Sequence, residues 1–382
     1  WSFKRITRRA LHSLRAPIEF ARQKSRLPLF HSTPTMNPLQ QLAVGLDVGT
    51  GGVRAVALSL RGRLIGEARS AFPKSVTTIH GPCVEQDPAA WRSASEHALR
   101  QLVSQIPKSA HIVGLSVDAT SGTFLVVDRE HRPLTPGIMY NDLRAAHIAN
   151  EAADALADVL TRFGIQIAPS FALTKLLYFA RTRPELFATT HRVVHQADWI
   201  IGSLCDRYDI SDVSTALKTG VDPSTLSWPD VIESQLGIPT ACLPQVVLPG
   251  TPIGQITPAA ARHTGLPAGT PVIAGCTDGT AGSLASGASQ AGDLNVTLGT
   301  TLVFKAVSNV PLVDPSGAIY NHRHPGGGYL PGAASSTGAE WTQSELGEAD
   351  LEALTHQVSG EVPTGHIVYP LRKHCLLYTS DA

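Results

Sequence analysis

The sequence predicts a mixed α/β fold. Its strands include hairpins, so the element order is not a simple βαβ alternation. Two adjacent apolar segments near residue 42, a long amphipathic helix pattern after residue 87, and later apolar strands ending in glycine and hydroxyl residues support this prediction. Hydrophobic residues make up 43% of the 382 residues and charged residues 16%, so the chain can bury a large core and is long enough for two domains.

The first expected elements form a hairpin meander followed by a helix. Residues 42–48 and 53–60 are apolar enough for buried strands, and the turn at 61–63 leads into a third strand. Asp87 and Pro88 predict a helix start, because aspartate caps the first turn and proline fits its first position. The apolar stripe of this helix consists of Trp91, Ala94, Ala98, Leu102 and Ile106.

The rest of the chain continues with shorter elements. In chain order we expect strands at 111–117 and 123–127, mainly helices over 145–205, proline- and glycine-rich loops with short strands over 244–275, a strand at 271–275, a small-residue helix at 281–287, and a strand at 293–298.

Charge and cysteine usage exclude several classes of function. The formal net charge is zero, which gives no general attraction to nucleic acid, and no apolar run approaches the ~20 residues of a membrane-spanning helix. The cysteines form no C-x-x-C pair, which predicts neither a disulfide framework nor a zinc site and favours a reducing compartment. His322 and His324 lack further ligands, so we expect no metal site there.

Residues 1–36 differ in composition from the rest of the chain. They hold eight lysine or arginine residues and one acid, Glu19. That composition is typical of an organellar transit peptide. The alternative is translated upstream sequence with Met36 as the true start, which would leave the protein in the cytoplasm.

The segment 45–54 (GLDVGTGGVR) predicts a phosphate-binding turn at a strand end. Its glycines let backbone N–H groups converge on a phosphate, Thr50 can bond phosphate oxygens, and Asp47 can hold Mg²⁺ or its waters. It is neither a Walker A loop nor a G-x-G-x-x-G turn opening a helix. The other interpretation is an ordinary hairpin turn.

Three further turns carry polar groups at strand ends. Asp278 in 275–282 (GCTDGTAG) can act as base on a substrate hydroxyl, or it can simply cap the following helix. The turn 297–301 (TLGTT) suits a second phosphate wall or a β-turn, and 118–123 (DATSGT) suits hydroxyl recognition or turns in general.

Taken together, these segments resemble the FGGY carbohydrate kinases, within the actin, hexokinase and heat-shock-70 ATPase superfamily. The resemblance runs in family order over roughly residues 42–372 and is far more specific than any single motif. The stretches that carry it include GLDVGTGGVRAV, VEQDPAAW, GLSVDATSG, MYNDLRA, TKLLYFARTRPELF, HQADWIIGSL, ISDVSTALKTGVDP, PVIAGCTDGTAGSLASGA and VTLGTTL. The 118–123 and 140–145 stretches are most similar to the plant and cyanobacterial branch called xylulose kinase-like or D-ribulose kinase.

The resemblance implies two ribonuclease-H-like α/β domains around a cleft. Residues 42–285 would form the N-terminal domain and 286–373 a partial C-terminal domain. An adenosine-binding, glycine-rich segment should follow 366–373, but CLLYTSDA follows instead, so we expect an incomplete second domain. Residues 374–382 match no family pattern, consistent with a cloning or frame-shift artefact. The branch also favours a plastid over a mitochondrion as the destination.

The resemblance also implies ATP-dependent, Mg²⁺-dependent phosphorylation of a ketopentose, with D-ribulose and D-xylulose both open and the oligomeric state unpredicted. Asp278 would deprotonate the sugar hydroxyl. The first phosphate loop would comprise Asp47, Thr50, Gly51, Gly52 and Arg54, and the second Gly299, Thr300 and Thr301. The sugar side would comprise Ser121, Asp118 and Asp142. Lys175 and Trp199 would be structural.

Two other functions share some of these features. An actin- or heat-shock-70-like ATPase would use the same phosphate loops without a sugar-side cluster. A catalytically impaired sugar- or nucleotide-binding fragment would follow from the absent adenosine segment. Stimulation of ADP release by free ketopentoses separates the kinase from the ATPase, and the sequence of the full transcript bears on the impaired fragment.

Overall fold

The computed structural model describes residues 40–298, 302–315, 317–335, 345–347 and 351–358. The chain divides into two units, Trp1–Asn37 and Pro38–Ala382, and every described residue belongs to the second. The predictions for residues 1–36, for Gly299, Thr300 and Thr301, and for residues 374–382 therefore lie outside the described residues.

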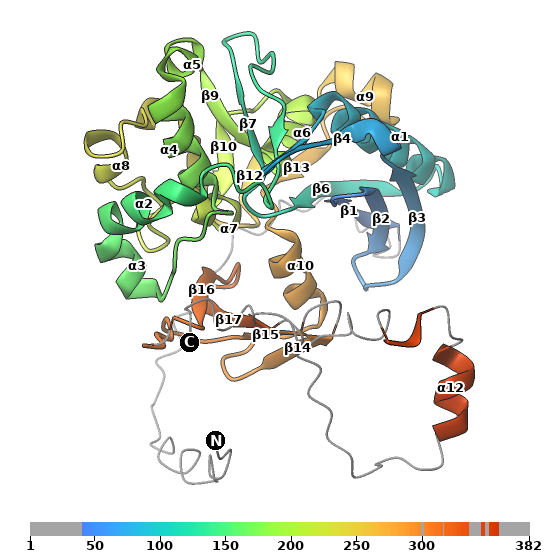
Figure 1. The fold of residues 1–382 in the computed structure, drawn as a ribbon. Helices are drawn as coiled ribbons and strands as arrows, with labels where there is room; N and C mark the ends of the chain where they lie inside the picture. Colours follow the sequence, from blue (N-terminus) through green and yellow to red (C-terminus); the bar gives the residue numbers. More distant parts are fainter. Residues whose placement is uncertain (1–39, 299–301, 316, 336–344, 348–350, 359–382) are drawn as a thin grey trace, which may run out of the picture. The chain divides into compact units, whose positions relative to one another are not determined.

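A six-stranded sheet carries the first part of the fold, with strand order β12-β13-β6-β1-β2-β3 (Figure 1). Its strands are β1 (Gln41–Val48), β2 (Gly52–Ser59), β3 (Leu64–Ala71), β6 (His111–Ala119), β12 (Pro252–Gln255) and β13 (Pro271–Ile273). β1 pairs antiparallel with β2, which confirms the predicted hairpin, and parallel with β6. Alternate residues of β1 are buried, from Leu42 to Val48, as expected when one face of a strand meets the core.

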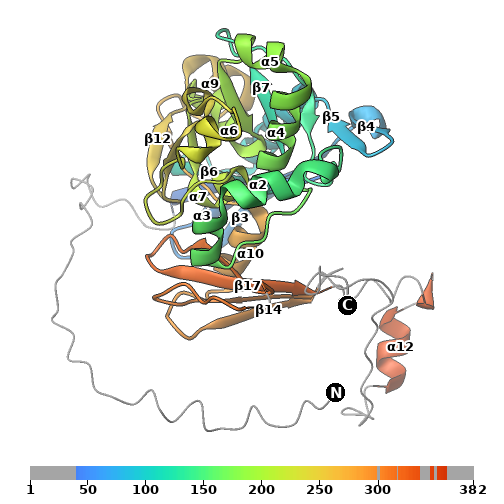
Figure 2. The same ribbon diagram turned by 60° about the vertical axis from the view of Figure 1, so that its left-hand side comes forward.

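Helices α1, α6 and α9 pack against one another on one face of this sheet (Figures 1 and 2). They span Pro88–Gln105, Gln196–Cys205 and Pro258–Thr264. The Asp87 carboxylate accepts the Ala89 N–H at 2.9 Å and Pro88 is the first helical residue, so the predicted start of α1 is confirmed. Trp199 of α6 donates its indole N–H to the Pro88 carbonyl at 2.9 Å, in agreement with the structural role expected for it.

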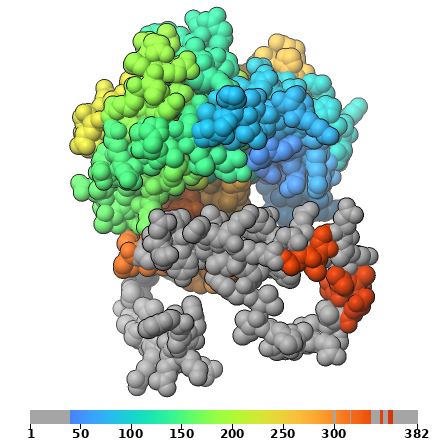
Figure 3. All heavy atoms as spheres, viewed as in Figure 1, coloured from blue at the N-terminus to red at the C-terminus, as the bar shows by residue number. Residues whose placement is uncertain are grey.

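A second, five-stranded sheet has the order β4-β5-β8-β7-β9 and antiparallel neighbours. Its strands are β4 (Thr77–His80), β5 (Cys83–Gln86), β7 (Phe124–Val127), β8 (Gly137–Ile138) and β9 (Arg192–His195). The short helices of this part are η1 (Lys74–Val76), η2 (Ala146–Ile148), α2 (Ala149–Ala155), α3 (Ala157–Phe163), α4 (Ala172–Thr182), α5 (Pro184–Thr189), α8 (Val231–Ser234) and η4 (Thr240–Cys242). On the face shown in Figure 3, the green residues of α2–α4 lie to the left of the blue residues of the first strands.

The segment between α6 and β13 holds several elements that the sequence did not reveal. β10 (Ile210–Asp212) pairs in parallel with β11 (Gln245–Val247) and leads into α7 (Val213–Ala216) and η3 (Leu217–Thr219). Helix α9 lies where we expected only loops and short strands. Thr257 caps it by accepting the Ala260 N–H, but its seven residues are too few for a periodic pattern to stand out.

A third sheet follows α10 (Asp278–Ala285), with the antiparallel order β14-β15-β17-β16. It consists of β14 (Leu294–Leu298), β15 (Leu302–Ala306), β16 (Tyr320–Arg323) and β17 (Tyr329–Ser335), and α12 (Leu351–Val358) comes later in the chain. The predicted small-residue helix and the strand after it are confirmed. Leu294, Val296 and Leu298 of β14 are 59%, 50% and 67% exposed.

His322 and His324 are both buried in this third sheet region. Among the residues that the structure describes, no group of three histidine, cysteine or acidic side chains is arranged to hold a metal ion. In the same described part, no helix is both long and apolar enough to cross a membrane.

Candidate active site

Three aspartates from separate strand ends meet at one edge of the first sheet. Asp47 of β1 pairs in parallel register with Asp118 of β6. The next residue of β6, Ala119, forms a parallel bridge with Thr277, which directly precedes Asp278. This close approach requires glycine at Gly275, where a Cβ would lie 1.9 Å from the Val117 carbonyl oxygen.

The electrostatics of this cluster are those of crowded carboxylates. Burial, followed by the negative charges of Asp47 and Asp278, raises the pKa of Asp118 to about 8. Burial also raises the pKa of Asp278, opposed by the Gly279 N–H, which donates to its Oδ1 at 2.6 Å, and by the charge of Lys218. A cation beside these groups would relieve their repulsion, so the donor set fits a hard oxygen-binding ion such as Mg²⁺.

The predicted phosphate loop connects β1 to β2 as a tight turn. Gly49 donates its N–H to the Gly52 carbonyl and Phe72 donates to the Gly51 carbonyl, both at 3.0 Å. A Cβ at Gly52 would lie 2.6 Å from the Ser70 carbonyl oxygen, so only glycine fits there. A hollow of about 320 Å³ opens beside the turn, lined by Asp47, Gly49, Gly51, Gly52, Val53, Arg54, Arg69, Ser70 and Ala71. The Arg54 guanidinium lies 3.8 Å from Asp47, on the rim of this hollow.

A second cavity, of about 270 Å³, borders the same loop at Thr50. It is lined by Thr50, Thr120, Ser121, Tyr140, Lys218 and Asp278. The hydroxyl of Ser121 is buried and has no hydrogen-bond partner among the described residues. A buried hydroxyl without a partner in a polar cavity is suited to bind a hydroxyl or carbonyl of a ligand.

The wall of this second cavity is held by buried polar contacts. The Thr120 hydroxyl lies 2.6 Å from Gln196 Oε1 and 2.7 Å from the Thr123 hydroxyl. Lys175 is fully buried and donates to the carbonyls of Gly122 at 3.1 Å and Met139 at 2.7 Å. Burial lowers the pKa of Lys175 to about 7. The amine thus ties together the two turns that present Ser121 and Tyr140, which supports its expected structural role.

The comparisons with known proteins agree with this geometry. The family model described as the FGGY family of carbohydrate kinases, N-terminal domain, matches residues 42–285, which is more than half of the chain. The chain belongs to the FGGY carbohydrate kinase family.

Its similarity extends to individual members of the family. It is 29% identical to xylulose kinase of Escherichia coli (strain K12) over 74% of this chain and 57% of that protein. It is 26% identical to gluconokinase of Bacillus subtilis (strain 168) over 82% of this chain and 61% of that protein. The crystal structure of xylulose kinase from Rhodospirillum rubrum matches with a TM-score of 0.75 at 24% identity, over 84% of this chain and 66% of that one. The chain thus spans about six tenths of these curated relatives, and the shared fold is the actin-like ATPase fold.

Two residues expected on the sugar side of this FGGY chain lie elsewhere. Asp142 is fully buried behind the cavity wall, where its Oδ2 accepts the Val84 N–H at 2.7 Å and also pairs with Arg144 at the same distance. Because its oxygens are already used, Asp142 supports the wall next to Tyr140 and does not line the cavity. Asp118 likewise faces the other two aspartates of the cluster and is absent from the cavity lining.

The cavity also contains residues that sequence reasoning missed. Tyr140 and Lys218 line it, yet each belongs to a stretch quoted above only for its family likeness. Lys305 of β15 is buried near Asp278 and lies 3.4 Å from the Thr280 hydroxyl, and burial lowers its pKa to about 8. The apolar surroundings of Lys218 in VSTALKTGV were the available signal, because a lysine inside an apolar turn is unusual.

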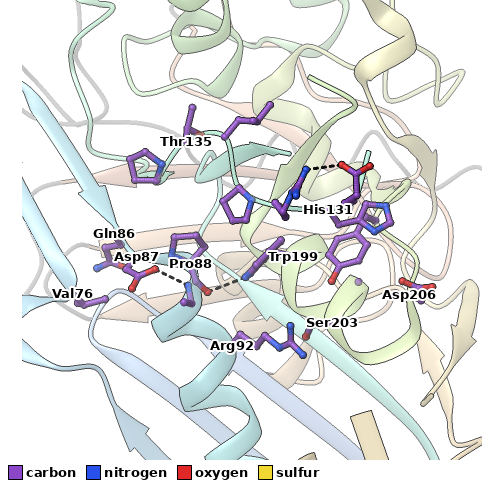
Figure 4. A pocket seen from close by; sticks show the side chains of 18 of the residues that line it. Val76, Gln86, Asp87, Pro88, Arg92, His131, Thr135, Trp199, Ser203 and Asp206 are labelled. Atoms are coloured by element: carbon purple, nitrogen blue, oxygen red, sulfur yellow. Dashed lines mark hydrogen bonds and ion pairs between the residues drawn. The ribbon is translucent and has the colours of Figure 1, made fainter. Parts of the chain in front are cut away.

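A cavity of about 1380 Å³, much larger than these two, lies elsewhere in the described part of the chain (Figure 4). It lies among the start of α1, the turn at 130–136, α6 and α9. Residues of the family stretches VEQDPAAW and HQADWIIGSL line it, but none of the residues predicted as base, phosphate loop or sugar side does. Among its lining residues, Gln86 is the one in contact with the phosphate loop, since its amide donates to the Thr50 carbonyl at 3.0 Å. Size alone therefore does not locate the chemistry of this FGGY protein.

Proposed function

We propose that this protein transfers the γ-phosphoryl group of ATP to a hydroxyl of a ketopentose, either D-ribulose or D-xylulose. The observation that carries the proposal is that residues of the phosphate loop line two separate cavities. Thr50 and Asp278 line the cavity of about 270 Å³, whereas Asp47, Gly51 and Gly52 line the hollow of about 320 Å³. A phosphate held by the loop and a hydroxyl held in the smaller cavity would meet at Asp278.

The chain's own groups suit in-line phosphoryl transfer. Asp278 would accept the proton of the attacking hydroxyl, and its raised pKa brings it closer to the operating pH, where a general base works best. Ser121 would bind an oxygen of the sugar, and the loop N–H groups would hold the phosphates. Positioning of the two substrates supplies much of the rate in this class of reaction.

Magnesium fits the same proposal. When bound, the ion would neutralise charge on the phosphate oxygens, a role it plays in phosphoryl transfer generally. The described residues hold no group of three direct ligands, so Asp47 would hold the ion through water while phosphate oxygens fill other positions. Gly299, Thr300 and Thr301 remain the proposed second phosphate loop.

The proposal is tested by measuring ADP release by the purified chain with ATP and Mg²⁺. The arms are D-ribulose, D-xylulose, D-gluconate and no sugar, because gluconokinase is also among the similar proteins. We expect stimulation by a ketopentose above the sugar-free rate. Equal ADP release in all arms would indicate a sugar-independent ATPase. Absence of ADP release together with measurable sugar or ATP binding would indicate a catalytically impaired protein.

A further inference from the structure

Lys218 brings a positive side chain into the smaller cavity beside the proposed base. It lies on η3, and its side chain lines the cavity together with Asp278 and Ser121. Its stem lies against Gly122, where an added Cβ would be 3.1 Å from Lys218 Cδ, and its Nζ is 5.8 Å from the centre of the Phe171 ring. In the described part of the chain, this Nζ has no carboxylate within ion-pair distance and no hydrogen-bond acceptor.

The turn that carries Lys218 is fixed from both sides. The adjacent Thr219 hydroxyl lies 2.8 Å from Nε2 of His195, and Nδ1 of the same ring lies 2.7 Å from the Asp198 carboxylate. All three of these side chains are almost fully buried. Gly220 then closes the turn with φ +95°, a conformation that other residues avoid. Lys218 is therefore held in the cavity and does not simply extend from a loose surface turn.

The same scaffold fixes Lys218 relative to Asp278. Thr277 donates its N–H to the Ser214 hydroxyl at 3.0 Å. Ser214 lies on α7, the short helix that runs directly into η3. Asp278 is the principal charge that opposes the lowering of the pKa of Lys218 by burial. The other lysine near Asp278, Lys305, has the Thr280 hydroxyl as a partner, so Lys218 is the lysine available to a ligand in this cavity.

The chemistry of a ketopentose offers one group that matches this donor. Ring closure of a ketopentose joins O5 to C2, so O5 is a free hydroxyl and C2 a free carbonyl only in the acyclic form. The carbonyl oxygen accepts hydrogen bonds and cannot donate, whereas a lysine ammonium donates and cannot accept. Ser121 and Asp278 can form hydrogen bonds with the sugar hydroxyls, which leaves the carbonyl oxygen as the natural partner of Lys218.

We propose that Lys218 donates a hydrogen bond to the C2 carbonyl of the acyclic ketopentose and thereby selects ketoses over the corresponding alditols. This proposal rests on the proposed function. An alditol carries a hydroxyl on a tetrahedral carbon at C2. The oxygen of this hydroxyl is a weaker acceptor in a different position from the carbonyl oxygen. Its O–H is a further donor, which the ammonium of Lys218 cannot accept.

The test compares kcat/KM for D-ribulose and D-xylulose with kcat/KM for ribitol and xylitol. We expect the wild-type chain to prefer the ketose, and Lys218→Met to reduce that preference roughly 10- to 100-fold, the range for losing a hydrogen bond to a charged group. Turnover with the alditols should change less than about 3-fold, since only the carbonyl contact is lost. The matched control is Lys108→Met, an exposed lysine outside both cavities, which should keep the wild-type preference.

Each outcome decides between specific alternatives. Equal turnover of ketose and alditol by the wild-type chain would overturn the assignment without any variant, even if Lys218→Met fails to fold. Ketose preference that survives in Lys218→Met would overturn the assignment and leave the proposed function intact. Preference for D-gluconate that is lost in Lys218→Met would assign the lysine to a carboxylate instead. No turnover of any sugar would overturn the proposed function, and this assignment with it.

Discussion

Thr277 donates its backbone N–H to the Ser214 hydroxyl at 3.0 Å, and that hydroxyl donates in turn to Asp212 Oδ1 at 2.5 Å. Asp212 also caps α7 by accepting the N–H groups of Ser214 and Thr215. The residue before the proposed base is thus bonded to the segment that carries Lys218. This buried hydroxyl therefore links the two halves of the cavity.

Replacing Ser214 by alanine leaves the buried Thr277 N–H without its partner. We expect the free energy of unfolding to fall by about 1–3 kcal/mol, and kcat to fall because Asp278 loses its fixed position. Urea titration and the ADP assay measure the two effects. Ser234→Ala on α8 is the control, since its hydroxyl only bonds the Asp230 carbonyl on an exposed surface. Wild-type stability in Ser214→Ala would show that the contact is dispensable.

Asp278→Asn removes the proposed base and keeps the shape of the side chain. Turnover should fall by about 10²–10⁴, the range for losing a positioned general base, while ATP binding stays near normal. Asp154→Asn, at an exposed aspartate of α2, serves as the control. More than half of the wild-type turnover in Asp278→Asn would contradict the base assignment.

Asp47→Ala should weaken Mg-ATP binding more than sugar binding, because Asp47 lines the phosphate-side hollow and not the sugar-side cavity. Calorimetric titration with a non-hydrolysable ATP analogue and Mg²⁺ measures the first affinity, and titration with the ketopentose measures the second. Unchanged affinity for the nucleotide would refute the proposed role of this loop.

Lys175 should make the stability of the protein depend on pH. Its pKa is about 7 in the folded chain, against about 10.5 for a free lysine, so between these values only the unfolded chain holds the proton. Stability from this residue is therefore lost as pH falls from 10.5 towards 7, by about 1.4 kcal/mol per pH unit at most. Urea titrations between pH 7 and 9 should show this slope for wild type and not for Lys175→Met. Equal slopes would mean that the buried amine stays charged.

Residues 1–36 should direct a fused fluorescent protein into an organelle, and we propose a plastid. The basic, acid-poor composition motivates the proposal. Microscopy of the fusion in plant cells measures the destination. Mitochondrial fluorescence would keep the transit peptide and change the organelle, whereas diffuse cytosolic fluorescence would favour Met36 as the start.

The strands and the first helix could be predicted because their signals are local. β1 and β2 are contiguous apolar segments, and the start of α1 is marked by Asp87 and Pro88. The site could be predicted only in part. Asp278 and Thr50 belong to the polar turns that the sequence singles out, but that both line one cavity follows only from the fold.

The rest depends on contacts between distant segments. The pairing of Asp47 with Asp118 follows from the register of two parallel strands, which no local pattern encodes. Asp142 was expected near the sugar from the family resemblance alone, but its oxygens bond Val84 and Arg144. Lys218 reaches the cavity through the packing of its turn around His195, more than twenty residues away in sequence.

The exposure of the cysteines gives the molecule a natural attachment point for a probe. Cys205, Cys242 and Cys276 are buried, whereas Cys83 on β5 is only partly buried, and the residue after it, Val84, bonds Asp142 behind the sugar-side wall. A thiol-reactive dye would therefore modify Cys83 before the buried thiols, once Cys375 is replaced by serine. Its emission would then report movement of that wall as a sugar enters, with no mutation in the cavity itself.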